Sequence, residues 1–183
     1  MSLLQSIEPP LKDRNTLTLA EKSKNSHTVY TALRTWLGRH PESTSRARIE
    51  NFIAAVHSIP DSGKIGTVGF CWGGRYTILS AKLEEVTAAY ACHPSLLSIP
   101  SDFEGLTKPL SLAVGSKDSL LDMESVEKIK GLLSNLNCST RVEVYPDQVH
   151  GFAIRGDWSG ERDRTAMEDT VKQGIAWFNK YLL

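Results

Sequence analysis

The stretch Lys64–Tyr76 reads KIGTVGFCWGGRY. It begins as an apolar run typical of a buried strand and then breaks into a cysteine followed, after one residue, by two glycines. Gly69–Gly74 fits the nucleophile-elbow pattern G-x-S-x-G, with Cys71 in the place of serine. In that pattern a sharp turn joins a strand to a helix and exposes the nucleophile. The stretch therefore predicts a strand, a turn at Cys71 and a helix.

The elbow predicts an activated thiol. We expect glycine at positions 69 and 73 because a Cβ at either place would clash within so tight a turn. Cys71 would stand at the first turn of the following helix, whose dipole favours thiolate, and the backbone N–H of Trp72 would face a developing oxyanion. Two other interpretations are a buried, inert cysteine and a phosphate-binding loop. The phosphate loop needs glycine where Cys71 stands, and the G-x-x-x-x-G-K-[ST] pattern is absent.

The rest of the chain alternates between strand and helix patterns. The first 25 residues are polar without a sustained period and are predicted to be an N-terminal arm or loop, whereas residues 26–183 form one α/β domain. This alternation predicts a mostly parallel sheet of about four strands with helices on both faces, a three-layer sandwich. The expected strands are Ile65–Phe70, Val86–Ala91, Leu110–Val114 and Val142–Tyr145, and the expected helices are Thr28–Leu37, Ser45–Ser58, Tyr76–Lys82, Leu121–Leu136 and Arg164–Leu183.

Composition limits the function classes. The 21 basic and 21 acidic residues leave no net charge to attract a nucleic acid or an anionic membrane, so a small-molecule partner is expected. The chain shows no leader pattern and no apolar run near the ~18 residues of a membrane span, which predicts a cytoplasmic protein. Its three cysteines have no Cys/His ligand spacing, so we expect no disulfide framework, no metal and no cofactor.

Candidate partners for the thiol follow later strands. In a parallel sheet the chemistry gathers at the carboxyl ends of the strands, and Asp118 and His150 follow the third and fourth predicted strands in the order acid then histidine. Alone, Asp118 is equally explained as a helix N-cap and His150 as a loop residue. Asp147 and Asp122 remain rival orienting carboxylates.

At these residues the chain resembles the dienelactone hydrolase family. GFCWGG, the aspartate of GSKDSL and the histidine of VHGF carry the resemblance, and His93–Ser95, His150–Asp157 and Ala176–Leu182 are similar to its fungal branch. The resemblance runs from about residue 28 to the C-terminus. It implies an α/β-hydrolase fold with Cys71 as nucleophile, Asp118 as orienting acid and His150 as base.

Further residues are candidates for the substrate pocket. The resemblance implies that Arg155 holds a substrate carboxylate, although its spacing from the histidine is one residue longer than in the bacterial members. His93 follows the second strand and is expected to line the pocket, with a simple turn before Pro94 as the alternative. Trp72 is expected to form a wall of the acyl site or, alternatively, to cover the sheet. Arg75 is expected in a surface or ion-pair contact on the elbow helix, with a contact to substrate as the alternative. The aromatic residues Trp36, Trp177 and Phe178 are expected in the core.

The N-terminal region departs from the family. Full-length relatives carry strands before the elbow, with the loop that donates a second oxyanion N–H and an acidic residue that activates the thiol, and this chain is expected to lack them. We therefore expect an apolar bare edge on the strand Ile65–Phe70 and a homo-oligomer, most simply a dimer, that buries it. Two functions are predicted: hydrolysis of a small-molecule ester or lactone by the triad, or, alternatively, isomerase, lyase or binding work by a repurposed member.

Overall fold

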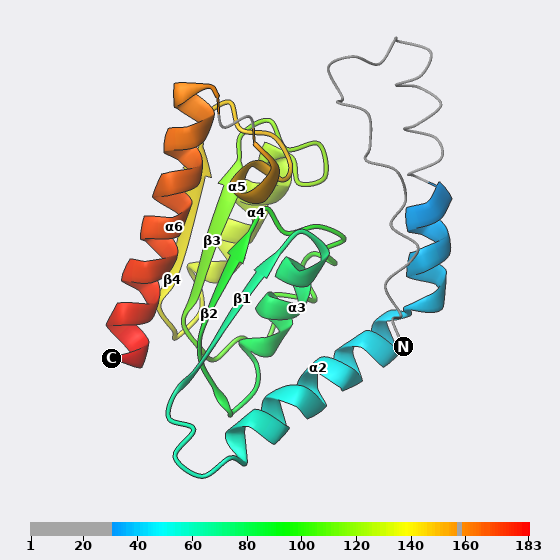
Figure 1. The fold of residues 1–183 in the computed structure, drawn as a ribbon, viewed down its shortest axis with the longest axis vertical. Coiled ribbons are helices and arrows are strands. Elements are labelled where there is room, and N and C mark those ends of the chain that lie inside the picture. The colour runs from blue at the N-terminus through cyan, green and yellow to red at the C-terminus, as the bar shows by residue number, and fades with distance from the viewer. Residues whose placement is uncertain (1–30, 157–158) are drawn as a thin grey trace, which may run out of the picture. The chain divides into compact units, whose positions relative to one another are not determined.

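The computed structural model describes residues 31–156 and 159–183 (Figure 1). The chain divides into two compact units, Met1–Ser45 and Arg46–Leu183. In the first, residues 31–39 are helical, and the exposed ring of Trp36 stacks on His40 with centroids 4.1 Å apart, so the expectation that Trp36 belongs to the core is wrong. The predicted arm 1–25 and the predicted helix start at Thr28 lie outside the described residues.

The second unit is built on a four-stranded sheet in the order β1-β2-β3-β4, and every neighbouring pair is parallel. The four predicted strands are present, and the apolar runs bounded by turn residues located them to within two residues at each end. Because all four strands point the same way, their carboxyl ends share one edge of the sheet. The strands are β1 (Ile65–Phe70), β2 (Val86–Cys92), β3 (Leu110–Gly115) and β4 (Thr140–Tyr145).

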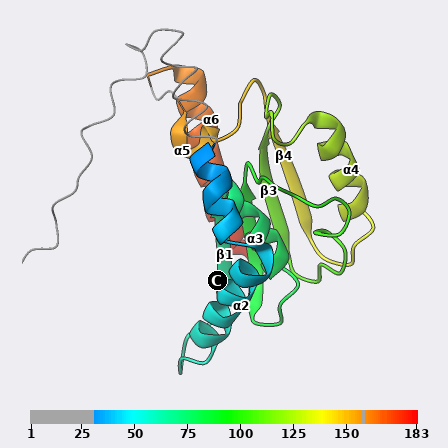
Figure 2. The same ribbon diagram turned by 90° about the vertical axis from the view of Figure 1, so that its right-hand side faces the viewer.

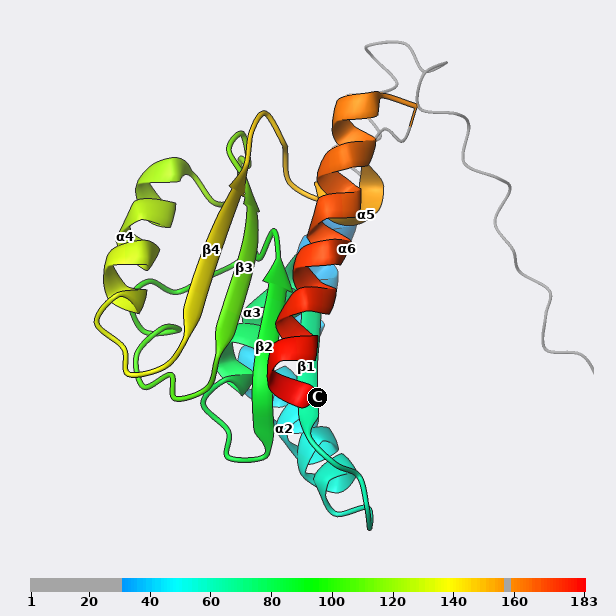
Figure 3. The same cartoon turned by 90° about the vertical axis from the view of Figure 1, so that its left-hand side faces the viewer.

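Helices cover both faces of this sheet, as Figures 2 and 3 show from two sides. Helices α3 (Trp72–Ser80) and α4 (Met123–Leu133) lie on one face, where Ile78 and Ile129 pack with Leu112 of β3. The other face carries α5 (Phe152–Arg155) and α6 (Glu161–Leu182), whose apolar residues pack with Tyr90, Ala113 and Tyr145. The predicted three-layer α/β fold is therefore confirmed.

The face by which α6 packs agrees only in part with its apolar residues at helical spacing, of which Met167 is buried and Phe178 packs against the core. Val171 and Ile175 are each 56% exposed. The buried side instead includes Gln173, whose side-chain amide donates to Ser111 Oγ and Leu112 O at 2.9 and 3.1 Å and accepts from Tyr145 Oη at 2.8 Å. Because these hydrogen bonds satisfy the amide, the polar Gln173 can be buried. Apolar periodicity alone predicts that Val171 and Ile175 are buried instead.

The helix before the sheet, α2 (Glu42–His57), begins three residues earlier than predicted. Of two neighbouring apolar residues of this helix, Ile53 is buried, whereas Phe52 is exposed. Within the described residues β1 pairs only with β2, so its other edge is unpaired, as predicted. In that described part, none of the helices has the length and apolar character needed to cross a membrane.

Candidate active site

The turn between β1 and α3 presents the thiol. Cys71 is the N-cap residue of α3 and adopts φ 53° and ψ −122°, a strained conformation for a residue with a side chain. A Cβ at Gly69 would collide with Thr77 Oγ1 and with the carbonyl of Gly73, as predicted. The same expectation for Gly73 is wrong, because a Cβ there meets nothing within 4 Å. At the next position, Gly74, an added Cβ would lie 3.0 Å from Pro94.

Asp118, His150 and Cys71 form one hydrogen-bonded chain. His150 Nε2 lies 3.1 Å from Cys71 Sγ, and His150 Nδ1 lies 2.9 Å from Asp118 Oδ2 and 3.1 Å from Asp118 Oδ1. The Asp118 carboxylate is fully buried and also accepts from Leu120 N at 2.8 Å. The three residues come from the ends of β1, β3 and β4, so the parallel sheet brings together the candidates that the sequence separates.

The electrostatics of these three hydrogen-bonded residues favour a Cys71 thiolate next to a His150 imidazolium. The hydrogen bond to His150 is the largest cause that lowers the pKa of Cys71 to about 7; burial opposes it, and Ser95 and the backbone N–H of Trp72 reinforce it. Burial also disfavours the charged form of His150, but its hydrogen bonds to Asp118 and Cys71 outweigh this effect and raise its pKa to about 9. Between these two values the pair is ionic.

The rival carboxylates have other partners. Asp147 pairs with Lys117 Nζ at 2.6 Å and with Arg162 at 3.3 Å. Asp122 is the N-cap of α4 and accepts from Ser125 N at 2.8 Å. Among these aspartates, only Asp118 has a hydrogen bond to the His150 ring in the described part of the chain.

The other two cysteines lie in less reactive surroundings. Cys92 is buried at the end of β2, and burial raises the pKa of its thiol to about 11. Burial also raises the pKa of Cys138. Of the three thiols, Cys71 alone has a lowered pKa.

The loop after β2 places two residues, His93 and Ser95, next to the thiol site. His93 has a φ of 36° and is 0% exposed, and its ring lies edge-on to that of His150 with centroids 5.2 Å apart. Burial lowers its pKa to about 4, so this ring is neutral. The buried Ser95 hydroxyl lies 3.5 Å from Cys71 Sγ. Sequence reasoning assigned no role to Ser95; its place two residues beyond His93 at a strand end was the available signal.

The side chains of the remaining candidate residues have the following contacts. The indole of Trp72 packs against Tyr76, with ring centroids 4.6 Å apart. Arg155 lies on α5, and its guanidinium covers Gly151, where an added Cβ would be 3.0 Å from Nε and Nη2. Arg75 forms a buried bidentate pair with Asp102, so it is an ion-pair residue. The described residues contain no group of three His, Cys, Asp or Glu that could hold a metal ion.

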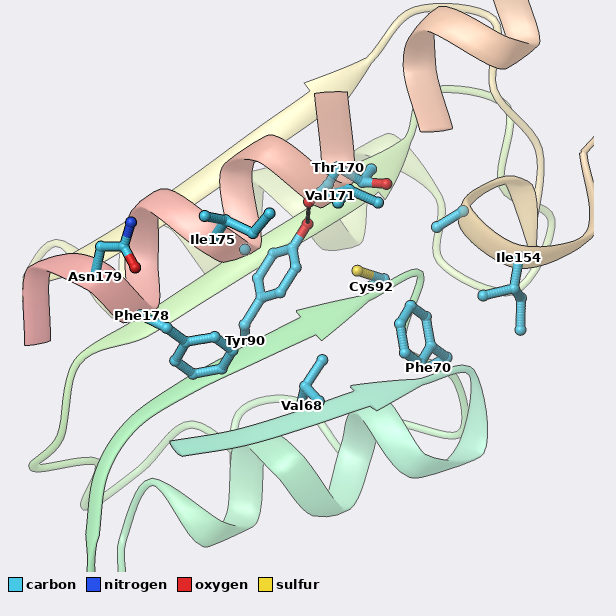
Figure 4. Close-up of a pocket in the computed structure, with 12 residues that line it drawn as sticks. Val68, Phe70, Tyr90, Cys92, Ile154, Thr170, Val171, Ile175, Phe178 and Asn179 are labelled. Carbon is cyan, nitrogen blue, oxygen red and sulfur yellow. Dashed lines mark hydrogen bonds between the residues drawn. The ribbon is translucent and has the colours of Figure 1, made fainter. Parts of the chain in front are cut away.

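An apolar cavity of about 500 Å³ lies beside β1, between the sheet and α6 (Figure 4). Phe70 and Cys92, which directly precede Cys71 and His93, line it together with Ile154, Val171 and Ile175. None of the three hydrogen-bonded residues lines it. The cavity is therefore next to the thiol site but distinct from it.

Comparison with known proteins agrees with this architecture. The chain is 31% identical over 119 residues to the hydrolase pyvD of Aspergillus violaceofuscus, covering 65% of this chain and 48% of pyvD. It is 29% identical over 143 residues to the hydrolase tropI of Talaromyces stipitatus, covering 78% of this chain and 56% of tropI. The chain thus spans about half the length of these relatives.

A solved structure shows the same fold. The putative dienelactone hydrolase of Klebsiella pneumoniae superposes with a TM-score of 0.64 at 26% identity, covering 77% of this chain and 62% of that one. The sequence model of the dienelactone hydrolase family matches residues 14–182, which is most of the chain. This chain therefore belongs to the dienelactone hydrolase family.

Proposed function

We propose that this chain hydrolyses an ester or lactone of a small molecule, with Cys71 as nucleophile, His150 as acid and base and Asp118 as the orienting carboxylate. The observation that carries the proposal is the hydrogen-bonded chain from Cys71 Sγ to His150 (3.1 Å) and on to Asp118 (2.9 Å). A nucleophile bonded to a base, which is itself oriented by a third group, is the arrangement that nucleophilic catalysis requires.

Acylation uses the ionic pair. The Cys71 thiolate attacks the substrate carbonyl carbon, a C–S bond forms, and the oxygen becomes an oxyanion near the N–H of Trp72. The intermediate collapses by breaking the bond between this carbon and the leaving oxygen. His150 Nε2 gives its proton to that oxygen, leaving a thioester on Cys71 and a neutral imidazole.

Deacylation reverses these roles. Neutral His150 takes a proton from water, and the resulting hydroxide adds to the thioester carbon. The C–S bond breaks, the acid product departs and the thiolate–imidazolium pair is restored. Asp118 holds the ring by Nδ1, so that Nε2 always faces the sulfur.

Arg155 is proposed to bind a carboxylate on the substrate. Its guanidinium lies over Gly151, directly after the proposed base, and presents planar donors suited to a carboxylate. A substrate bearing an anionic group would therefore be oriented with its ester near Cys71.

The active form is proposed to be a homodimer that covers the unpaired edge of β1. Val68 on this edge is exposed, and it lines both the cavity in Figure 4 and a second groove of about 410 Å³ on the α3 side of the strand. An uncharged, apolar strand edge favours pairing with another chain. Light scattering at micromolar concentration tests this assembly, and a monomer that stays soluble would reject it.

The hydrolase proposal is tested with a panel of activated esters and lactones, comparing wild type with Cys71→Ala. Hydrolysis by wild type that falls by several orders of magnitude in the variant supports it. Equal rates for the two proteins would contradict it. No turnover by wild type, with Cys71 still alkylated rapidly by iodoacetamide, would instead favour the isomerase, lyase or binding alternative.

A further inference from the structure

We propose that Ser95 is a further catalytic residue, whose hydroxyl donates a hydrogen bond to the Cys71 thiolate. This inference rests on the proposed function, because it assigns a role within the same reaction. Ser95 Oγ lies 3.5 Å from Cys71 Sγ, a hydrogen-bond distance for the large sulfur atom, and the residue is buried. A thiolate carries no proton, so the serine must be the donor.

The backbone fixes this contact. Ser95 N donates to Cys71 O at 3.1 Å, and Cys71 N donates to Cys92 O at 3.2 Å, so the elbow and the loop after β2 are joined by two main-chain hydrogen bonds. The loop bends sharply, with positive φ at His93 (36°) and at Leu96 (58°) on either side of Ser95. These bends return the chain over the elbow and point the hydroxyl at the sulfur.

A buried ion pair anchors the far end of the loop. Arg75 of α3 donates from Nε and Nη2 to the two carboxylate oxygens of Asp102 at 2.8 and 3.1 Å. Asp102 also accepts from Ser98 N at 2.7 Å. The segment from residue 95 to 102 is thus tied to the same helix that Cys71 caps, which preorganises the hydroxyl relative to the thiol.

A hydroxyl at this place acts at two steps of the reaction. In the resting enzyme it stabilises the thiolate and so favours ionisation at neutral pH. In the thioester the sulfur is uncharged and the hydrogen bond is weak; it strengthens as the C–S bond breaks and charge returns to the sulfur. The same donor therefore assists formation of the nucleophile and its departure.

The other ionisable groups near the sulfur are few. His150 faces it from the segment after β4, with Asp118 behind it from the end of β3. The ring of His93 packs edge-on against that of His150, and the guanidinium of Arg155 on α5 covers Gly151. None of these groups contacts the Ser95 hydroxyl within the described residues, so a substitution at Ser95 removes one donor and leaves the charges in place.

The test is the pH dependence of iodoacetamide alkylation at Cys71, followed by peptide mass spectrometry. Wild type is expected to titrate with a midpoint at about 7. In Ser95→Ala we expect this midpoint to rise by about one pH unit with an undiminished rate at high pH, because one hydrogen bond to the charged form is lost. Ser95→Thr, which keeps the hydroxyl, should restore the midpoint. Ser101→Ala, which removes an exposed hydroxyl of the same loop, is the matched control.

The outcomes separate the two proposals. A wild-type midpoint near that of a free thiol, about 8.5, would contradict the activated nucleophile itself. A low wild-type midpoint that Ser95→Ala leaves unchanged would overturn only the role of Ser95. A Ser95→Ala variant that lowers the high-pH rate without moving the midpoint would also overturn it, because that pattern reports access to the sulfur rather than its ionisation.

Discussion

Arg75→Ala tests whether burial makes the ion pair beneath the loop after β2 important for stability. The Arg75 and Asp102 side chains are only 12% and 4% exposed, and two hydrogen bonds of 2.8 and 3.1 Å join them. Removing the arginine leaves a buried carboxylate with Ser98 N among its remaining donors. Stripping one partner from such a pair costs about 3–5 kcal/mol, because an uncompensated charge stays buried. Since the arginine is partly accessible to water, we expect a loss of about 3 kcal/mol in the free energy of unfolding.

Urea denaturation followed by circular dichroism measures this loss. At a typical slope of about 2 kcal/mol per molar urea, the unfolding midpoint should fall by about 1.5 M. A double variant, Arg75→Leu with Asp102→Leu, should lose less than Arg75→Ala, because no charge remains buried.

The chain supplies a matched control on its surface. Arg141 and Glu143 make a contact of 2.8 Å, like that of Arg75, but their side chains are 49% and 44% exposed. Arg141→Ala should therefore cost no more than about 0.5 kcal/mol. Equal losses for the two arginine variants would refute the reasoning. They would show that burial does not determine how much an ion pair contributes to the free energy of unfolding.

Three further predictions concern the site. Hydrolysis of a neutral ester should rise with pH through about 7, as Cys71 ionises, and fall through about 9, as His150 loses the proton that the leaving group needs; a rate that is flat from pH 6 to 10 would count against the ionic pair. Gly69→Ala should lower the free energy of unfolding by about 2 kcal/mol or more, because its Cβ meets backbone, whereas Gly73→Ala should change it by less than about 1 kcal/mol; thermal melting of the two variants checks the contrast. Arg155→Ala should raise KM about tenfold for an ester bearing a carboxylate and leave a neutral ester unaffected; equal effects on both in steady-state kinetics would reject the proposed contact.

Much of the fold was predictable because its strands are short apolar runs between turn residues. The parallel sheet and both helical layers follow from that alternation. Helix α5 was not predicted, because its four residues are too few to show a helical pattern of apolar residues. It begins after Gly151, which has a φ of 89°. The packing face of α6 was predictable only in part, because Gln173 is buried through hydrogen bonds to β3 and Tyr145, which hydrophobicity does not record.

The candidate site was predictable where a residue follows a strand directly. Cys71, Asp118 and His150 lie at the ends of three parallel strands, so their order along the chain was enough to suggest their meeting. The contact of Ser95 with the thiol depends instead on the backbone angles of its two neighbouring turns, at His93 and Leu96. Sequence patterns do not specify those angles for residues other than glycine.

Positive φ angles at residues with side chains also occur beside the proposed base. Residues with side chains adopt positive φ at the end of β1 (Cys71, 53°), at the end of β2 (His93, 36°) and after β4 (Asp147, 60°). Each such conformation costs about 1–3 kcal/mol, and glycine would relieve most of it. Retaining a side chain there makes sense only if its contacts outweigh the strain. Two of these residues, Cys71 and His93, contact His150, which the sequence indicates as the base. The third, Asp147, instead pairs with Lys117 and Arg162.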